Sequence, residues 1–175
     1  TSWVPPGMFG YEENVGLGYD PAKAKKLIEQ AGFGPEKPLP KITLGFNTNS
    51  DHQRIAENVQ AQLKRNLGVN LELKNEEWKG YLSNLQSDPP HIYRMGWLAD
   101  YADPETFLNL MHSDSDNNHT HWSNRIDDEL LYKAVRELDR EKRKELYTKA
   151  QKILTEEDVP VVPVFAGVTQ MLVSE

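Results

Sequence analysis

One short run of this sequence, residues 94–101, brings together a cation, an aromatic side chain and an acid. Arg94 and Asp100 stand six positions apart, with Trp97 between them, where an expected apolar strand gives way to a loop. A guanidinium forms charge-assisted hydrogen bonds with a carboxylate, and an Asp carboxylate does so with an ammonium group. The pair could therefore bind the two ends of a zwitterion, with the indole of Trp97 as a flat apolar wall.

Each of these residues also has an ordinary structural interpretation, which spacing alone favours. Arg94 and Asp100 could form a surface ion pair or cap a loop, and Trp97 could belong to the core. His52 falls in the first turn of an expected helix, where free N–H groups and the helix dipole favour anions. It could help to bind a ligand carboxylate, or it could be a solvated histidine.

A polar loop at residues 112–124 offers a possible metal site. Its three histidines are His112, His119 and His121. Imidazole suits zinc and nickel, so a metal-binding loop stays open as an alternative. The interpretation we adopt is a polar, turn-forming loop without a metal.

Catalytic motifs are scarce in the chain. It has no Cys, no Gly-x-Ser-x-Gly run and no His-Glu-x-x-His run, which excludes the common nucleophile and zinc-hydrolase signatures. A hydrolase using Asp100, Asp103 or Glu105 as acid or base would need a nucleophile or a metal that the sequence does not offer. We therefore expect a protein that is not an enzyme and has no cofactor.

Size and charge narrow the function further. The chain has 175 residues and a formal net charge of -7, enough length for one domain with a real core. Nucleic-acid binding depends on clustered Lys and Arg, so an acidic chain argues against it. No apolar run approaches the ~20 residues that a bilayer-spanning helix needs.

The elements that must position the candidate residues follow from periodicity. Residues 1–19 are expected to form an irregular segment rich in Pro, Gly and aromatic residues. Asp20-Pro21 predicts a helix that ends at Gly32. The rest of this region predicts strands at 42–46, 69–73 and 92–97 and helices over 50–67, opened by a capping box at Ser50, and 78–85. This alternation predicts βαβ units and a largely parallel sheet.

The last third of the chain is expected to be mostly helical. Asp103-Pro104 predicts a short helix to Met111, and apolar residues at helical spacing predict two more helices around 130–138 and 140–154, the second capped by Asp139. The apolar stretch at 159–168 contains Pro and predicts an edge strand.

Several short motifs in a fixed order resemble those of one family, the extracytoplasmic solute-binding proteins of peptide-type ABC transporters, which bind oligopeptides or dipeptides. The motifs are Tyr19–Ala24, Ala31–Phe33, Leu67–Val69, Glu77–Lys79, Gly96–Tyr101, Asp103-Pro104, Phe107-Leu108, Asn117-Asn118, Tyr147–Ala150 and Val159-Pro160 with Pro163. The resemblance extends over nearly the whole chain, and the run at Gly96–Tyr101 is its most specific part.

The resemblance implies a fold: an α/β lobe of the type II periplasmic-binding-protein-like class, with a mixed, largely parallel sheet flanked by helices. Residues 1–175 would form the single C-terminal lobe of a two-lobe protein whose N-terminal lobe is missing here. It also implies residue roles. The position of Asp100 binds the peptide ammonium, Arg94 and His52 serve the carboxylate, and Trp97 lines a side-chain pocket; Tyr101, in the same motif, completes the expected ligand-binding set.

The resemblance further implies a function without catalysis. We expect a monomeric binding protein that passes peptides, oligopeptides above all, to a membrane ABC-transporter permease. It would be periplasmic or extracellular, with a lipid anchor in a Gram-positive cell. Other branches of the family bind nickel, haem or oligosaccharides, which are the alternatives, and an acid/base hydrolase is the weakest one.

Overall fold

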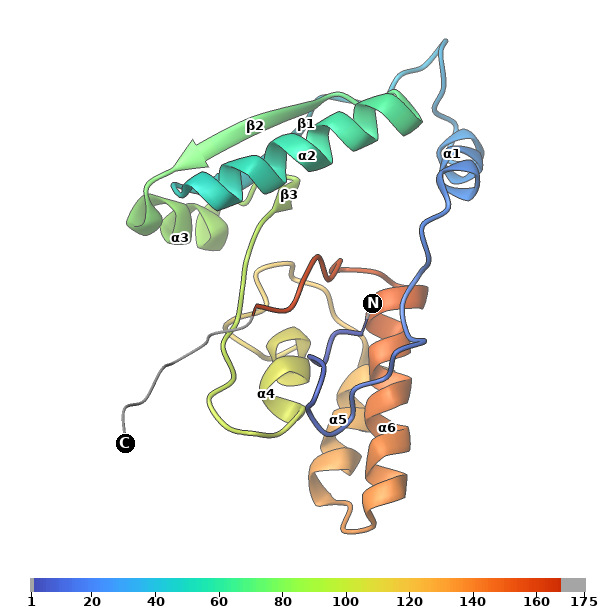
Figure 1. Ribbon diagram of the computed structural model, residues 1–175, viewed down its shortest axis with the longest axis vertical. Helices are drawn as coiled ribbons and strands as arrows, with labels where there is room; N and C mark the ends of the chain where they lie inside the picture. Colours follow the sequence, from blue (N-terminus) through green and yellow to red (C-terminus); the bar gives the residue numbers. More distant parts are fainter. Residues whose placement is uncertain (1, 168–175) are drawn as a thin grey trace, which may run out of the picture. The chain divides into compact units, whose positions relative to one another are not determined.

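The computed structural model describes residues 2–167, which divide into two compact units. Unit 2 is the continuous stretch 19–96, and unit 1 contains the residues described before and after it (Figure 1). The chain therefore leaves unit 1 after Gly18 and returns to it at Trp97. That residues 1–175 act as one lobe stays a prediction.

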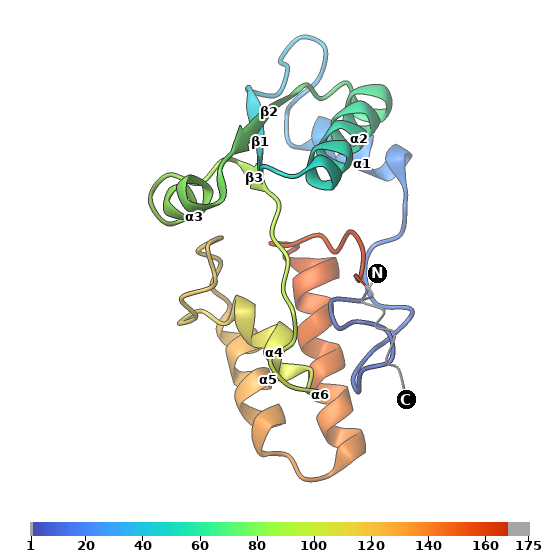
Figure 2. The same ribbon diagram turned by 60° about the vertical axis from the view of Figure 1, so that its left-hand side comes forward.

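Unit 2 contains a three-stranded sheet with the order β2-β1-β3 (Figure 2). Its strands are β1 (Ile42–Asn47), β2 (Leu71–Glu76) and β3 (Ile92–Tyr93), and both pairings are parallel. The helices α2 (Ser50–Leu67) and α3 (Trp78–Ser87) connect them, so the expected βαβ order is confirmed. Because the strands are parallel, their carboxyl ends meet at one edge of the sheet, where open α/β sheets bind ligands.

Both faces of β1 are covered. Leu44 and Phe46 are buried in one core with Ala56 of α2. Between them, Gly45 points to the opposite face, where a Cβ would meet Pro90 and the ring of Tyr81 in α3. Packing on both faces therefore fixes the register and the position of β1.

The helix ends of unit 2 follow the sequence with one correction. The helix α1 (Pro21–Gln30) is capped by Asp20, whose carboxylate accepts from the backbone N–H of Lys23 at 2.9 Å, as predicted. For α2 the expected capping box at Ser50 is wrong. The cap is Asn49, whose side chain accepts from the N–H groups of Asp51 and His52.

The third strand is shorter than predicted. Only Ile92 and Tyr93 pair with β1, although the backbone N–H of Arg94 still donates to Gly45 O at 2.9 Å. The expectation of a strand over 92–97 is wrong, because pairing with β1 stops after Leu44 and Gly45. Arg94 thus lies directly at the carboxyl edge of the sheet.

Unit 1 is helical. Its elements are α4 (Glu105–Leu108), the 3-10 helix η1 (Asn109–Met111), α5 (Arg125–Arg136), α6 (Arg140–Lys152) and the π-helix η2 (Ile153–Glu157). The helices α5 and α6 form an antiparallel pair (Figure 2), and Asp139 caps α6 as predicted. Among the described residues, no helix is long and apolar enough to cross a bilayer.

Residues 2–19 form no helix or strand, and those up to Gly18 belong to unit 1 and pack against its core. Val4 is fully buried in the core with Leu108, Tyr147 and Leu154. The buried amide of Gln151 accepts from Val4 N at 3.1 Å and donates to the backbone oxygen of Gly10 at 2.9 Å. One polar side chain of α6 therefore satisfies the backbone of an irregular segment that lies far away in the sequence.

The edge strand predicted over 159–168 is wrong for the part that the structure describes. Residues 159–167 form no strand, and Val168 lies outside the described residues. The side chains of Val162, Val164 and Phe165 are exposed. Val159 has a φ of 50°, which takes the backbone out of the extended conformation at the start of this stretch.

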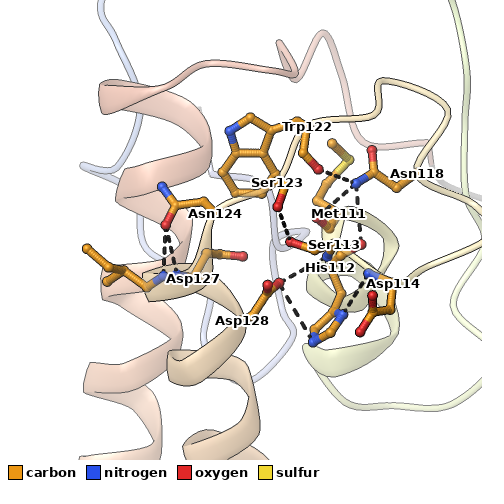
Figure 3. Close-up of polar contacts among 11 residues, drawn as sticks. Met111, His112, Ser113, Asp114, Asn118, Trp122, Ser123, Asn124, Asp127 and Asp128 are labelled. Atoms are coloured by element: carbon orange, nitrogen blue, oxygen red, sulfur yellow. Dashed lines mark hydrogen bonds and ion pairs between the residues drawn. The ribbon is translucent and has the colours of Figure 1, made fainter.

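One buried acid of unit 1 has no counterpart in the predictions. Asp127 on α5 is fully buried, and neither carboxyl oxygen has a hydrogen-bond partner among the described residues (Figure 3). Burial above all, with the nearby carboxyl groups of Asp128 and Asp158, raises the pKa of Asp127 to about 7. An unpaired carboxyl in such surroundings is more stable with its proton.

The close approach at Gly45 generates a first prediction. A Cβ there would lie 2.5 Å from Pro90 Cγ, so Gly45→Ala should destabilise unit 2 by about 1–3 kcal/mol, as overpacking does. Amide hydrogen exchange of β1 and β2 measures the effect. Gly80→Ala on α3 is the control, because nothing lies within 4 Å of that position; equal protection in the two variants would contradict the packing described.

Asp127 generates a second prediction, on pH. The unfolded carboxyl loses its proton near pH ~4, whereas the folded one keeps it up to a pKa of about 7. The contribution of Asp127 to the free energy of unfolding should therefore be largest below about pH 4, fall up to about pH 7 and level off above it. Asp127→Asn should remove most of this fall.

Urea denaturation of the chain across this pH range, followed by tryptophan fluorescence, measures the free energy of unfolding. All other ionisable groups are the same in the two proteins, so the difference between wild type and variant isolates Asp127. The control variant Asp116→Asn, at an exposed position, should have the same pH profile as the wild type. A variant at Asp127 with the same profile would show that this carboxyl does not hold a proton in the folded state.

Candidate functional site

Arg94 lies at the carboxyl edge of the sheet in unit 2, held by its backbone. Its N–H donates to Gly45 O at 2.9 Å, and its carbonyl accepts from the buried hydroxyl of Tyr81 at 2.7 Å. A Cβ at Gly96 would lie 3.0 Å from Arg94 Nη2, so this glycine leaves room for the guanidinium. The backbone on both sides of the Arg94 side chain is therefore fixed by the sheet and α3.

The guanidinium of Arg94 has no acceptor within residues 2–167. It is half-buried, and this burial lowers its pKa, although a guanidinium stays charged in proteins. A partly desolvated cation gains most from an anionic partner with planar geometry. A carboxylate fits this requirement.

His52 also lies at the carboxyl edge of this sheet, in the first turn of α2. Its backbone N–H is held by the Asn49 side chain, and its Nδ1 lies 3.4 Å from Asn47 O. With the proton on Nδ1, the ring donates to that carbonyl and leaves Nε2 without a partner among the described residues. The parallel order of the sheet thus brings Arg94 and His52 to one edge.

Trp97 and Asp100 belong to unit 1, where both are tied to one buried residue, Thr106. Trp97 Nε1 donates to Thr106 Oγ1 at 3.2 Å, and Asp100 N donates to the same oxygen at 3.3 Å. The carboxylate of Asp100 is exposed, and no described residue pairs with it. The Trp97 side chain is neither fully buried nor part of either hydrophobic core, so its interpretation as a core residue is wrong.

The acid three positions later is paired. Asp103 forms a two-point ion pair with Arg143 of α6, at 2.8 Å and 3.0 Å, and accepts from Tyr147 Oη at 3.2 Å. Its Oδ1 also accepts from Glu105 N at 3.0 Å. These bonds anchor the end of the loop that carries Trp97 and Asp100.

Tyr101 is exposed, and its hydroxyl is engaged with its neighbour. The phenol donates to Glu105 Oε2, and this hydrogen bond raises the pKa of Tyr101 to about 12. The ring is open to contact. Tyr101 can thus offer an aromatic face, while its hydroxyl already has a partner.

The five residues predicted from the sequence therefore divide between the units. Arg94 and His52 belong to unit 2, and Trp97, Asp100 and Tyr101 belong to unit 1. Among the described residues, neither Arg94 nor Asp100 has an ionic partner within its own unit. That all five contact one ligand stays a prediction.

Sequence reasoning missed Thr106, Asp103 and Tyr81 as supports of the site. Asp103 was noticed only as a helix start and, with Glu105, as a conceivable acid or base. Their supporting roles arise from partners that folding brings close, which no local spacing reveals.

The histidine loop has a structural explanation. Asn118 is buried and donates to the carbonyl groups of Met111, His112 and Trp122 (Figure 3). His112 Nδ1 accepts from Asp114 N, and its Nε2 lies 3.7 Å from Asp128. Within the part of the chain that the structure describes, no three His, Cys, Asp or Glu side chains gather into a possible metal site.

Comparisons with known proteins agree with this fold. Residues 1–119 match the model of a family described as bacterial extracellular solute-binding proteins, family 5 Middle. The oligopeptide-binding protein OppA of Bacillus subtilis is 42% identical over 171 residues, covering 93% of this chain and 31% of that protein. The chain thus spans about a third of the length of this relative.

Solved structures show the same likeness. The Escherichia coli murein tripeptide binding protein MppA has a TM-score of 0.81 at 35% identity, over 90% of this chain and 32% of its own. Haemophilus influenzae OppA, in a complex with RPPGFSPFR, has a TM-score of 0.73 at 32% identity, over 78% and 27%. The expected type II periplasmic-binding-protein-like α/β fold is confirmed.

The resemblance noted in the sequence is therefore confirmed by a family model that matches most of the chain and by a relative that aligns with nearly all of it. The chain belongs to the family 5 bacterial extracellular solute-binding proteins.

Proposed function

We propose that the protein containing this chain binds peptides outside the cytoplasmic membrane, oligopeptides above all, and passes them to the permease of an ABC transporter. Asp100 binds the peptide ammonium, Arg94 and His52 the carboxylate, and Trp97 and Tyr101 contact the side chains. The protein acts as a monomer, without chemistry of its own. In a Gram-positive cell a lipid anchor would attach it to the membrane.

One observation carries the proposal: Arg94 and Asp100 have opposite charges, and neither has an ionic partner among the described residues. The nearby acid Asp103, by contrast, is paired with Arg143 at 2.8 Å. A ligand with one ammonium and one carboxylate supplies the two missing partners. Arg94 is also partly desolvated, which strengthens its attraction for an anion.

The names of relatives support the same ligand class. The Bacillus subtilis relative is called an oligopeptide-binding protein, and the Haemophilus influenzae relative was crystallised with a nine-residue peptide. Since this chain spans about a third of such proteins, a further lobe would complete the site. Closure of the two lobes around the peptide is the hinge motion expected of a binding protein.

The ammonium contact generates a prediction for the full-length protein. Asp100→Ala should weaken binding of a peptide with free ends by about 1–3 kcal/mol, because the buried ammonium loses its acceptor. Isothermal titration calorimetry measures the change. Asp116→Ala, another exposed acid of unit 1, should bind like the wild type; equal affinities of the Asp100 and Asp116 variants would remove Asp100 from the site.

The carboxylate contact generates a separate prediction. Arg94→Gln should weaken binding of a peptide with a free carboxylate by about 1–3 kcal/mol, and of the same peptide with a C-terminal amide by less, since a charge-assisted hydrogen bond is lost only in the first case. Competition binding with the two peptides gives the comparison. Arg65→Gln, an exposed position on α2, is the control. An equal loss for both peptides would mean that Arg94 does not bind the carboxylate.

A further inference from the structure

Thr106 is a buried polar residue in the first turn of α4, with only 5% of its surface exposed. Its Oγ1 accepts two hydrogen bonds, one from Trp97 Nε1 at 3.2 Å and one from Asp100 N at 3.3 Å. A hydroxyl oxygen has two lone pairs, so both are in use. The donors lie nine and six positions earlier in the sequence, in a loop without regular structure.

We propose that Thr106 is the positioning residue of the peptide site: its one hydroxyl oxygen orients the Trp97 indole and the backbone that carries Asp100. This role rests on the proposed function of Asp100. The Trp97 indole and the Asp100 backbone then keep a fixed geometry relative to one another, because each is bonded to the same Thr106 oxygen.

The loop needs such a support. Among the described residues, two hydrogen bonds hold residues 97–100, and both end on Thr106. Leu98, between the two tied residues, is 84% exposed and adds little packing. Without the Thr106 oxygen, the loop would keep its anchor at Asp103 and lose its hold on the residues that meet the ligand.

Thr106 is itself held firmly. Its backbone N–H donates to Asp103 O at 3.3 Å, and the side chain of Asp103 is fixed by Arg143 and Tyr147. The order of support therefore runs from α6 through Asp103 and Thr106 to the ligand-binding loop. Binding groups held by locked supporting residues bind better because less ordering remains to be done on binding.

A purely structural role would have a different signature. If the hydroxyl only satisfied two N–H groups, its loss would lower stability and weaken every ligand alike. A positioning role predicts a selective loss: the preference for a free ammonium over a blocked N-terminus should decrease, because that preference depends on where the Asp100 carboxylate lies.

The test uses the full-length protein and one peptide in two forms, with a free amino group and N-acetylated. Thr106→Val keeps the shape and removes the acceptor, and Thr106→Ser keeps the acceptor. Thr155→Val is the matched control, since Thr155 is also buried in unit 1, at 3% exposed, and its hydroxyl donates to Gln151 O at 2.8 Å. Calorimetry gives the affinities, and thermal unfolding shows that each variant is folded.

We expect Thr106→Val to weaken binding of the free peptide about tenfold, equivalent to about 1.4 kcal/mol, and to weaken the acetylated peptide less. Thr106→Ser and Thr155→Val should retain the wild-type ratio of affinities. In an Asp100→Ala background, Thr106→Val should no longer change that ratio. A folded Thr106→Val with the wild-type ratio would overturn the positioning role, and the effect of Asp100→Ala alone would still support the proposed function.

A wild-type protein that binds both peptide forms equally would overturn the proposed function and this role with it. Hydrogen exchange in the wild type adds a test that needs no variant. The Asp100 amide, bonded to Thr106, should exchange more slowly than those of Leu98 and Ala99, which donate no hydrogen bond in the structure. Equal exchange at the three amides would contradict the Thr106 bond.

Discussion

The ion pair between Asp103 and Arg143 is the contact on which the loop that carries Trp97 and Asp100 depends. Asp103 ends the loop that carries Trp97 and Asp100, while Arg143 lies on α6 and also donates to Ala134 O in the last turn of α5 at 3.0 Å. The same guanidinium lies over the ring of Phe9. The Arg143 side chain therefore connects the irregular first segment, helices α5 and α6, and the loop that carries Trp97 and Asp100. Because the guanidinium bonds to the Asp103 carboxylate at two points, it fixes the orientation of that carboxylate as well as attracting it.

This arrangement separates two kinds of charge. Asp103 and Arg143 satisfy one another inside the fold, whereas Asp100 and Arg94 remain without partners in their respective units. Their electrostatic attraction is available to a ligand that carries both charges. With the proposed function, such a design would tolerate many peptide sequences, because the charged ends are common to all peptides and the side chains can be accommodated by water. Thr106 and Tyr81 each form a hydrogen bond with the backbone of one of these charged residues.

Much of the fold could be predicted from local signals. Asp20 and Asp139 mark helix starts because caps act within one turn, and the alternate apolar residues of β1 and β2 pack into one core. The failures concern properties that depend on distant partners. The length of β3 depends on what β1 offers, and residues 159–167 form no strand although they are apolar. The candidate residues were found through their charge and motif, but Thr106 and Asp127 were not, since a buried threonine or an internal acid has no local pattern that sets it apart.

The central claim is that Arg94 and Asp100 bind the opposite ends of one peptide. A crystal structure of the full-length protein with a bound peptide of defined sequence tests it most directly. We expect the peptide ammonium within hydrogen-bond distance, about 2.7–2.9 Å, of the Asp100 carboxylate, and the peptide carboxylate on the side of Arg94 and His52. A peptide whose ammonium is bound by another acid, with Asp100 left in solvent, would contradict the account.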